Sequence, residues 1–149
     1  MNTQDFTTTI LVDQTPEEVF NAINNVRAWW FGKIEGNTEK LNDEFTYQYE
    51  TFHYTKQRIA EVIPNKKIVW LVIESNLSFI EDKNEWTGTK IIFDITEKGN
   101  QTQVRFTHEG LVPKNECYNE CSNAWSSIIR HSLYNLITKK EKAEKLMSI

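Results

Sequence analysis

The stretch TQVRFTHEGLVPKNECYNECSNAWSSIIRHSLYNLI, residues 102–137, decides the fold because its hydrophobic period changes within it. Before Gly110, alternate residues share one face, as in a half-buried strand that would place Val104, Phe106 and His108 together. After Gly110, apolar residues recur at steps of three and four, which predicts one long amphipathic helix. We expect this helix to begin near Asn115 as its N-cap and to run to about Lys142. Its apolar stripe comprises Cys117, Cys121, Ala124, Trp125, Ile128, Ile129, Leu133, Leu136 and Ile137.

Strand signals fill most of the chain between Gly32 and this helix. Short turns such as Pro64-Asn65-Lys66 and Lys98-Gly99-Asn100-Gln101 separate the runs, so neighbouring strands should pair antiparallel. The alternating or apolar runs are 45–50, 57–63, 68–73, 89–95 and 102–108, with a short additional strand expected within 32–37. The segment 76–85 fits neither helix nor strand clearly.

The N-terminal part predicts one strand followed by two short helices. Residues 6–13 alternate and are rich in β-branched side chains. Thr15 can cap a helix that starts at Pro16, and Glu18 can complete a capping box. A second short turn carries Val26, Trp29 and Trp30 and stops at Gly32.

The element order indicates an α+β domain that spans residues 1–149. An antiparallel sheet with one apolar face needs a cover, and the C-terminal helix is the element with a matching stripe. A strongly twisted sheet curls around such a helix, and large side chains on both surfaces can leave a cavity near the open end. An aromatic content of 12% with 5 tryptophans is a first hint of a lined pocket.

Composition disfavours several classes of partner. The net charge is −4, which disfavours a nucleic-acid partner. The longest apolar run, Ile68 to Ile73, is far shorter than the roughly 20 residues of a membrane-spanning helix. The first residues lack the basic and apolar pattern of a secretory signal, so we expect a cytoplasmic location.

Several sequence blocks carry a resemblance to a known family: Thr15–Phe20, Trp29-Trp30, Trp86–Thr89, Phe106–Leu111, Glu116–Tyr118 and Trp125. They resemble the bacterial homologues of the activator of the ninety-kilodalton heat-shock protein ATPase, over essentially the whole chain. Thr107-His108-Glu109-Gly110-Leu111 is the most specific block. The resemblance implies the helix-grip fold of the START-like or birch-pollen-allergen-like superfamily, a curved antiparallel sheet of six or seven strands around the last helix. It also implies a cavity for apolar or amphipathic small molecules, and no cofactor.

The two cysteines, Cys117 and Cys121, are spaced i, i+4 on the predicted helix. That spacing suits a disulfide poorly, so we expect reduced thiols that pack against the core. A metal site with His108 as third ligand is the alternative, but its spacing matches none of the usual structural zinc sites.

Nine residues are the candidate ligand contacts. His108 is the most interesting because it combines an inward position with a titratable ring. It could bind a ligand carboxylate or carbonyl or act as an acid or base, but a structural imidazole is the favoured interpretation. For each aromatic candidate taken singly, plain core packing is the favoured interpretation. The full set is Tyr47, Tyr49, Trp70, Phe93, Phe106, His108, Cys121, Trp125 and Ile129.

The sequence therefore predicts a small-molecule binding domain without assigned catalytic or metal-ligating residues. No nucleophile elbow, phosphate loop or zinc-protease motif occurs in the sequence. One alternative is a cyclase-type cavity enzyme that uses His108 with Asp94 or Glu61. A second is a chaperone-associated module that stimulates an ATPase. An exposed apolar patch could also serve a homodimer.

Overall fold

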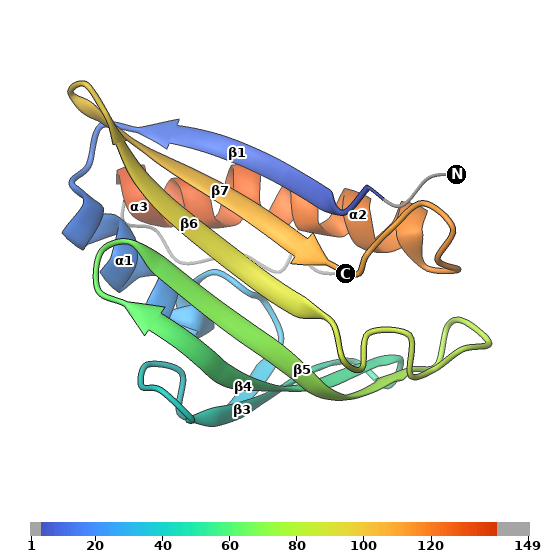
Figure 1. Cartoon of the computed structure of the whole chain (residues 1–149). Coiled ribbons are helices and arrows are strands. Elements are labelled where there is room, and N and C mark those ends of the chain that lie inside the picture. Colours follow the sequence, from blue (N-terminus) through green and yellow to red (C-terminus); the bar gives the residue numbers. More distant parts are fainter. Residues whose placement is uncertain (1–3, 140–149) are drawn as a thin grey trace.

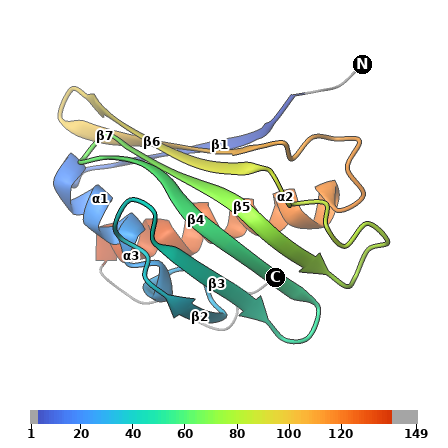
Figure 2. The same cartoon turned by 60° about the horizontal axis from the view of Figure 1, so that its bottom comes forward.

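A curved antiparallel sheet and one long helix make up most of the protein (Figures 1 and 2). The computed structural model describes residues 4–139. Seven strands follow the spatial order β1-β7-β6-β5-β4-β3-β2 and pair antiparallel throughout, which confirms the predicted helix-grip architecture. Their bounds are β1 Phe6–Val12, β2 Lys33–Gly36, β3 Glu44–Tyr49, β4 His53–Ile63, β5 Lys67–Leu77, β6 Lys90–Lys98 and β7 Gln101–Glu109.

Two short helices follow β1, as predicted. Helix α1 spans Pro16–Asn24, and one 3₁₀ turn, η1, spans Val26–Ala28. The predicted capping box is present: the Glu18 backbone N–H donates to Thr15 Oγ1 at 3.2 Å, and the Thr15 N–H donates to Glu18 Oε1 at 3.1 Å. The expected extra strand within 32–37 is β2.

The C-terminal helix begins later than predicted. It consists of α2, Tyr118–Ser127, a π-helical segment η2, Ile128–Leu133, and α3, Tyr134–Lys139. Asn115 does not cap it: its Oδ1 accepts from the Val112 N–H at 2.6 Å and closes a turn ahead of the helix. The predicted end near Lys142 lies outside the described residues.

The π-helical segment keeps one row of side chains turned to the sheet. Trp125, Ile129, Leu133 and Ile137 are spaced four residues apart, and each is at most 3% exposed. In a regular α-helix, steps of four residues drift by about 40° each around the axis. The wider π turn reduces that drift, so the row stays inward along the helix.

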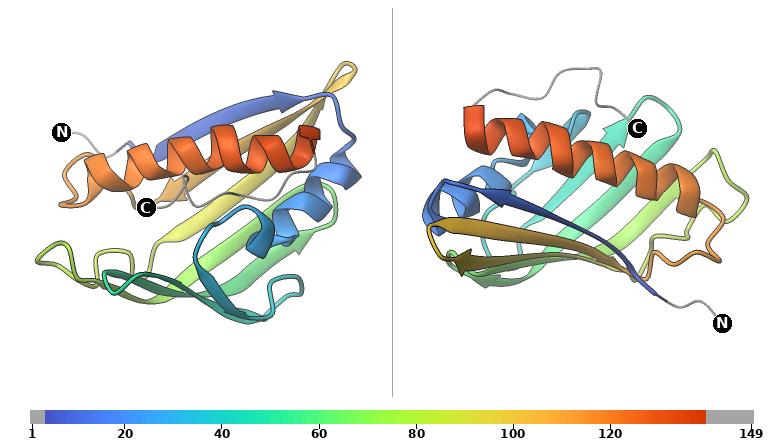
Figure 3. Two further views of the ribbon diagram at one scale, coloured as in Figure 1. Left: turned by 180° about the vertical axis from the view of Figure 1, so that it is seen from behind. Right: turned by 90° about the horizontal axis from the view of Figure 1, so that it is seen from above.

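The helix lies in the concave side of the sheet, as the views from behind and above show (Figure 3). Pairing between β4 and β5 shifts register at Lys56/Gln57 and again at Ile59/Glu61. Such bulges bend strands and increase twist. They help this half of the sheet to curl under the helix.

Two glutamates join the β5–β6 loop to the start of α2. The Glu85 carboxylate accepts from the backbone N–H groups of Glu116 at 2.8 Å and Cys117 at 3.0 Å. The Glu116 carboxylate accepts in turn from the N–H groups of Glu81 at 3.0 Å and Asp82 at 3.1 Å. These backbone hydrogen bonds lower the pKa of Glu116. We call this reciprocal pair the glutamate clasp, and it closes the end of the grip opposite α1 (Figure 1).

Candidate functional site

The interior between sheet and helix is built mainly from aromatic rings. All five tryptophans are at most 1% exposed. Trp29 and Trp30 both stack nearly parallel to Trp70, with ring centroids 6.1 and 6.0 Å away. Both members of the Trp29-Trp30 pair therefore lie inside the grip. Phe93 extends the cluster from β6, with its centroid 5.0 Å from that of Trp70.

Five rings at the clasp end form a closed circuit of contacts, which we call the aromatic box. Going round the circuit, successive centroid distances are 3.9, 5.0, 5.9, 4.9 and 5.2 Å. The members in that order are Tyr47, Trp30, Trp125, Trp86 and His53. They come from β3, the segment after η1, α2, the β5–β6 loop and β4, so the box forms only when the whole grip is assembled.

Polar side chains run along the inner face of β4 beside the box. His53, Thr55 and Gln57 alternate along the strand, and each is fully buried. Thr55 pairs directly with Tyr47 across β3 and β4, and the Gln57 amide nitrogen donates to Thr55 Oγ1. We call these three residues the polar stripe. A run of three buried polar residues beneath aromatic rings is unusual for a core strand.

His108 is fully satisfied by hydrogen bonds. The Trp125 indole N–H donates to His108 Nδ1 at 3.1 Å, which leaves the proton of a neutral ring on Nε2. That nitrogen lies 2.8 Å from Thr89 Oγ1, and the Thr89 hydroxyl donates to the Trp86 carbonyl at 2.6 Å. Burial, with a smaller contribution from nearby His53, lowers the pKa of His108 to about 3. The neutral ring therefore links helix, sheet and loop.

His53 has the opposite environment. It is 0% exposed, and neither of its ring nitrogens has a hydrogen-bond partner. Burial lowers its pKa to about 3, so the ring stays neutral at physiological pH. His53, like His108, is an inward polar group among apolar side chains. Unlike those of His108, its ring nitrogens have no hydrogen-bond partner.

Eight of the nine predicted contact residues lie in the interior, each 0% exposed: Tyr47, Trp70, Phe93, Phe106, His108, Cys121, Trp125 and Ile129. Tyr49 is half-buried at the rim and contacts Phe31 and Phe52. The Trp70 side chain points inward from β5. Within the box, the Tyr47 hydroxyl donates to the Phe31 carbonyl at 2.8 Å, and burial raises its pKa.

The sequence prediction missed the polar stripe. The predicted strand began at Gln57, whereas β4 begins at His53. Tyr54, Lys56 and Arg58 on the other face are also polar or amphipathic, so no contrast between faces marks the strand. Extending the alternation backwards from buried Ile59 would have placed His53, Thr55 and Gln57 inward.

Asp94 and Glu61, considered as catalytic partners of His108, are not beside it. Glu61 is exposed beyond the β4 bulge, and Asp94 lies between the inward residues Phe93 and Ile95 and points to the other face. The box and stripe therefore contain no carboxylate.

The two cysteines are free and buried, as predicted. A hydrogen bond with Cys121, together with burial, raises the pKa of the Cys117 thiol. Among residues 4–139, no group of three or more His, Cys, Asp or Glu side chains is arranged to hold a metal ion.

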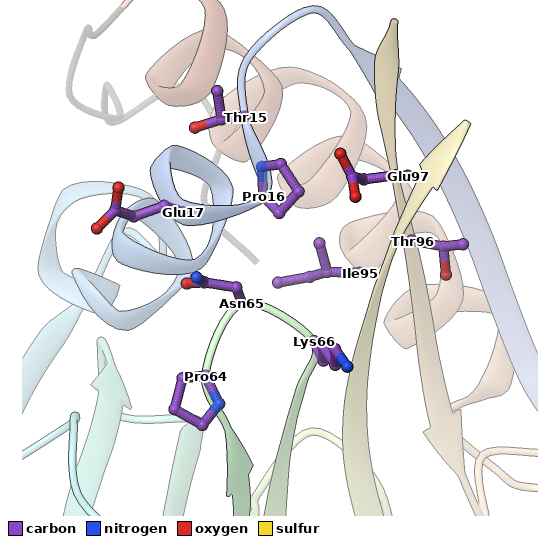
Figure 4. A pocket seen from close by; sticks show the side chains of 9 residues that line it. All are labelled: Thr15, Pro16, Glu17, Pro64, Asn65, Lys66, Ile95, Thr96 and Glu97. Atoms are coloured by element: carbon purple, nitrogen blue, oxygen red, sulfur yellow. The ribbon is translucent and has the colours of Figure 1, made fainter. Parts of the chain in front are cut away.

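The grooves on the surface of the described chain include four that contain none of the box residues. The largest of these four, of about 600 Å³, lies where the start of α1, the β4–β5 turn and β6 meet (Figure 4). Its walls carry Glu17, Lys66 and Glu97, and Ile95 points into it. None of the nine predicted contact residues lines any of these four grooves.

Solved structures of other proteins share this fold. The Aha1 dimer from Colwellia psychrerythraea matches with a TM-score of 0.72 and 22% identity, over 90% of this chain and 96% of that one. Protein SSP2350 from Staphylococcus saprophyticus matches at 0.69 and 17% identity, over 95% and 96%. CalU16 from Micromonospora echinospora matches at 0.65 and 14% identity, over 95% and 77%.

The sequence itself gives the family. No curated protein matches it. Within the described part of the chain, no helix is long and apolar enough to cross a membrane. A family model does match residues 13–141, which is most of the chain and includes both the box and the stripe. The chain therefore belongs to the family of Activator of Hsp90 ATPase homolog 1-like proteins.

Proposed function

We propose that this protein is a binding module that holds a small apolar or amphipathic molecule between the sheet and the C-terminal helix. The walls are the aromatic box and the adjoining rings, which offer large apolar surfaces with a few polar atoms. Ligand sites in proteins commonly combine these two features. The eight interior residues predicted from sequence supply the contacts, and Tyr49 lies at the rim.

The observation that carries the proposal is the set of buried polar atoms without partners. In the interior they include both nitrogens of His53, Oε1 of Gln57 and the indole nitrogens of Trp30, Trp70 and Trp86. Each such group costs about 1–3 kcal/mol when it is removed from water unpaired. A domain that only needed a stable core would carry apolar side chains here. A ligand that forms hydrogen bonds with these atoms would explain why the protein tolerates this cost in stability.

Entry requires the interior to open, because the rings pack closely. The β5–β6 loop is the element best placed to move. It carries Trp86, whose centroid lies 4.9 Å from that of His53 and 4.7 Å from that of His108. The exposed hydrogen bonds of the glutamate clasp hold this loop to α2. Outward movement of the loop would withdraw Trp86 and expose His53.

Native mass spectrometry of gently purified protein tests the proposal directly. We expect a retained small molecule or, after its removal, saturable binding of a lipid-like probe such as 1-decanol that shifts tryptophan emission. The variant Glu85→Gln weakens the clasp and should accelerate association. Glu120→Gln, at an exposed position on α2, is the matched control and should leave the rate unchanged. Absence of retained molecules and of any binding across a broad panel would refute the proposal.

The alternatives have separate tests. In a cyclase-type enzyme, His53 is better placed for acid–base chemistry than His108, because its nitrogens are free. Turnover of a polyketide-like substrate that is lost in His53→Phe would favour that role. A chaperone role predicts that the isolated chain stimulates a chaperone ATPase. A homodimer, suggested by the Aha1 dimer, is tested by sedimentation equilibrium.

A further inference from the structure

Among the described residues, all the buried polar side-chain atoms without a hydrogen-bond partner, except Oε1 of Gln14, lie in one part of the interior. His53 and Gln57 both lie on the polar stripe, Trp30 is a box neighbour of the stripe-paired Tyr47, and Trp70 stacks on Trp30. Two indoles of the same cluster are paired: Trp29 Nε1 donates to the Ile23 carbonyl at 3.0 Å, and Trp125 Nε1 donates to His108 at 3.1 Å. Two of the five buried indoles are therefore paired, and the three that are not belong to the box, as Trp30 and Trp86 do, or stack on it, as Trp70 does.

The free atoms include both hydrogen-bond donors and acceptors. An indole nitrogen can only donate, so Trp30 and Trp70 offer donors. Gln57 Oε1 can only accept, and a neutral imidazole such as that of His53 offers one donor and one acceptor. A molecule that satisfies the set must itself both donate and accept. Trp86 Nε1, on the β5–β6 loop, is a third indole donor without a hydrogen-bond partner.

The same region contains no charge. The box and the stripe hold no acidic or basic side chain other than His53, which burial keeps neutral. An ionised ligand group placed here would lose its hydration without gaining a counter-charge, and each such ion costs several kcal/mol. Carboxylates, phosphates and ammonium groups are therefore poorly matched to this site.

The shape of the walls favours a flat apolar body. The planes of Trp29, Trp30 and Trp70 lie within 13° of one another, and Tyr47 stacks on Trp30 at 3.9 Å and 9°. Parallel rings gain most from another planar ring stacked against them. A flexible acyl chain would use this surface less well.

We infer that this interior selects an uncharged, flat aromatic molecule carrying a group that both donates and accepts a hydrogen bond, such as a phenol or enol. The inference rests on the proposed function and narrows it to a ligand class. The polar stripe would form hydrogen bonds with the hydroxyl group, and the parallel indoles would stack against the aromatic ring.

Three matched probes test this inference at neutral pH: 2-naphthol, which is uncharged and polar, naphthalene, which lacks the polar group, and 2-naphthoate, which is charged. We expect 2-naphthol to bind at least about tenfold more tightly than either of the others by titration calorimetry. In ¹⁵N spectra, the indole signals of Trp30 and Trp70 should move. Those of Trp29 and Trp125 are already hydrogen-bonded and should move less.

Variants of the polar stripe test whether its side chains cause the preference for 2-naphthol over naphthalene. His53→Phe and, separately, Gln57→Leu should reduce the preference for 2-naphthol over naphthalene. His53→Phe removes an unpaired polar group, whereas Gln57→Leu also removes the hydrogen bond to Thr55 Oγ1, so tryptophan fluorescence checks that both variants are folded. Gln103→Leu, on the outer face of β7, is the matched control and should leave the preference intact. Equal binding of the three probes, tighter binding of 2-naphthoate, or an unchanged preference in both stripe variants would overturn the inference and leave the proposed function standing. If none of the probes binds and no retained molecule is found, both fail.

Discussion

Replacing His53 with phenylalanine should remove a large part of this protein's loss of stability in acid. His53 is fully buried and unpaired, and its pKa falls from the ordinary 6.5 to about 3 on folding. Protons therefore bind the unfolded chain more tightly than the folded one. Above pH 6.5 the titration of His53 therefore leaves the free energy of unfolding unchanged. As the pH falls from 6.5 towards 3, it lowers the free energy of unfolding.

The magnitude follows from these two pKa values. At pH 5 the unfolded imidazole is almost fully protonated, while the folded one is not. Since one pKa unit corresponds to about 1.4 kcal/mol, each such histidine lowers the free energy of unfolding by about 2 kcal/mol between pH 8 and pH 5. His108, whose pKa also falls to about 3, adds a similar amount. The sum is a substantial part of the 5–15 kcal/mol typical of domains.

Urea unfolding at pH 8 and pH 5, followed by tryptophan fluorescence, measures the effect. The wild-type loss should exceed that of His53→Phe by about 2 kcal/mol. At pH 8, His53→Phe should be more stable than the wild type by about 1–3 kcal/mol, because an unpaired polar group is replaced by an apolar ring. His131→Gln, at an exposed position on the helix, is the control and should behave as the wild type. An equal loss in His53→Phe and the wild type would refute the assignment of His53 as a buried neutral group.

Three further predictions concern other parts of the fold. Glu85→Gln should lower the free energy of unfolding by about 1 kcal/mol, because a neutral amide accepts more weakly from the N–H groups at the start of α2, whereas Glu120→Gln should have little effect. Thr15→Ala removes the α1 cap and should lower it by about 1 kcal/mol, measured by urea unfolding; restoration by Thr15→Ser would confirm the capping mechanism. Cys117 and Cys121 should react with a thiol reagent only as fast as the protein opens, and rapid labelling of the native protein would contradict their burial.

The fold was predictable because its two hydrophobic periods are strong and well separated by Gly110. Each strand of the sheet and the long helix corresponds to an alternating or amphipathic run that is visible in the sequence. The start of the helix was not predictable, because the N–H groups of Glu116 and Cys117, immediately before it, are paired with Glu85, a residue about thirty positions earlier. Local capping rules therefore assigned this role to Asn115.

The candidate site was predicted in outline but not in its chemistry. Burial of residues such as Trp70 and Ile129 follows from periodicity. The hydrogen-bond partners within the core do not follow from periodicity, because they depend on which residues, distant in the sequence, come into contact. His108 and His53 are equally buried, yet only His108 has partners, and these come from Trp125 and Thr89. The sequence alone could not distinguish a histidine whose hydrogen bonds connect parts of the fold from one whose ring nitrogens are free to bind a ligand.

The π-helical segment Ile128–Leu133 has a consequence for comparing this chain with its relatives. A π turn accommodates one residue more than the α-helical turn it replaces. A relative whose last helix is regular should therefore carry one residue fewer in this segment. An alignment that omits this single gap would rotate every later position by about 100° around the helix axis and would equate surface residues with residues such as Ile137 that face the sheet.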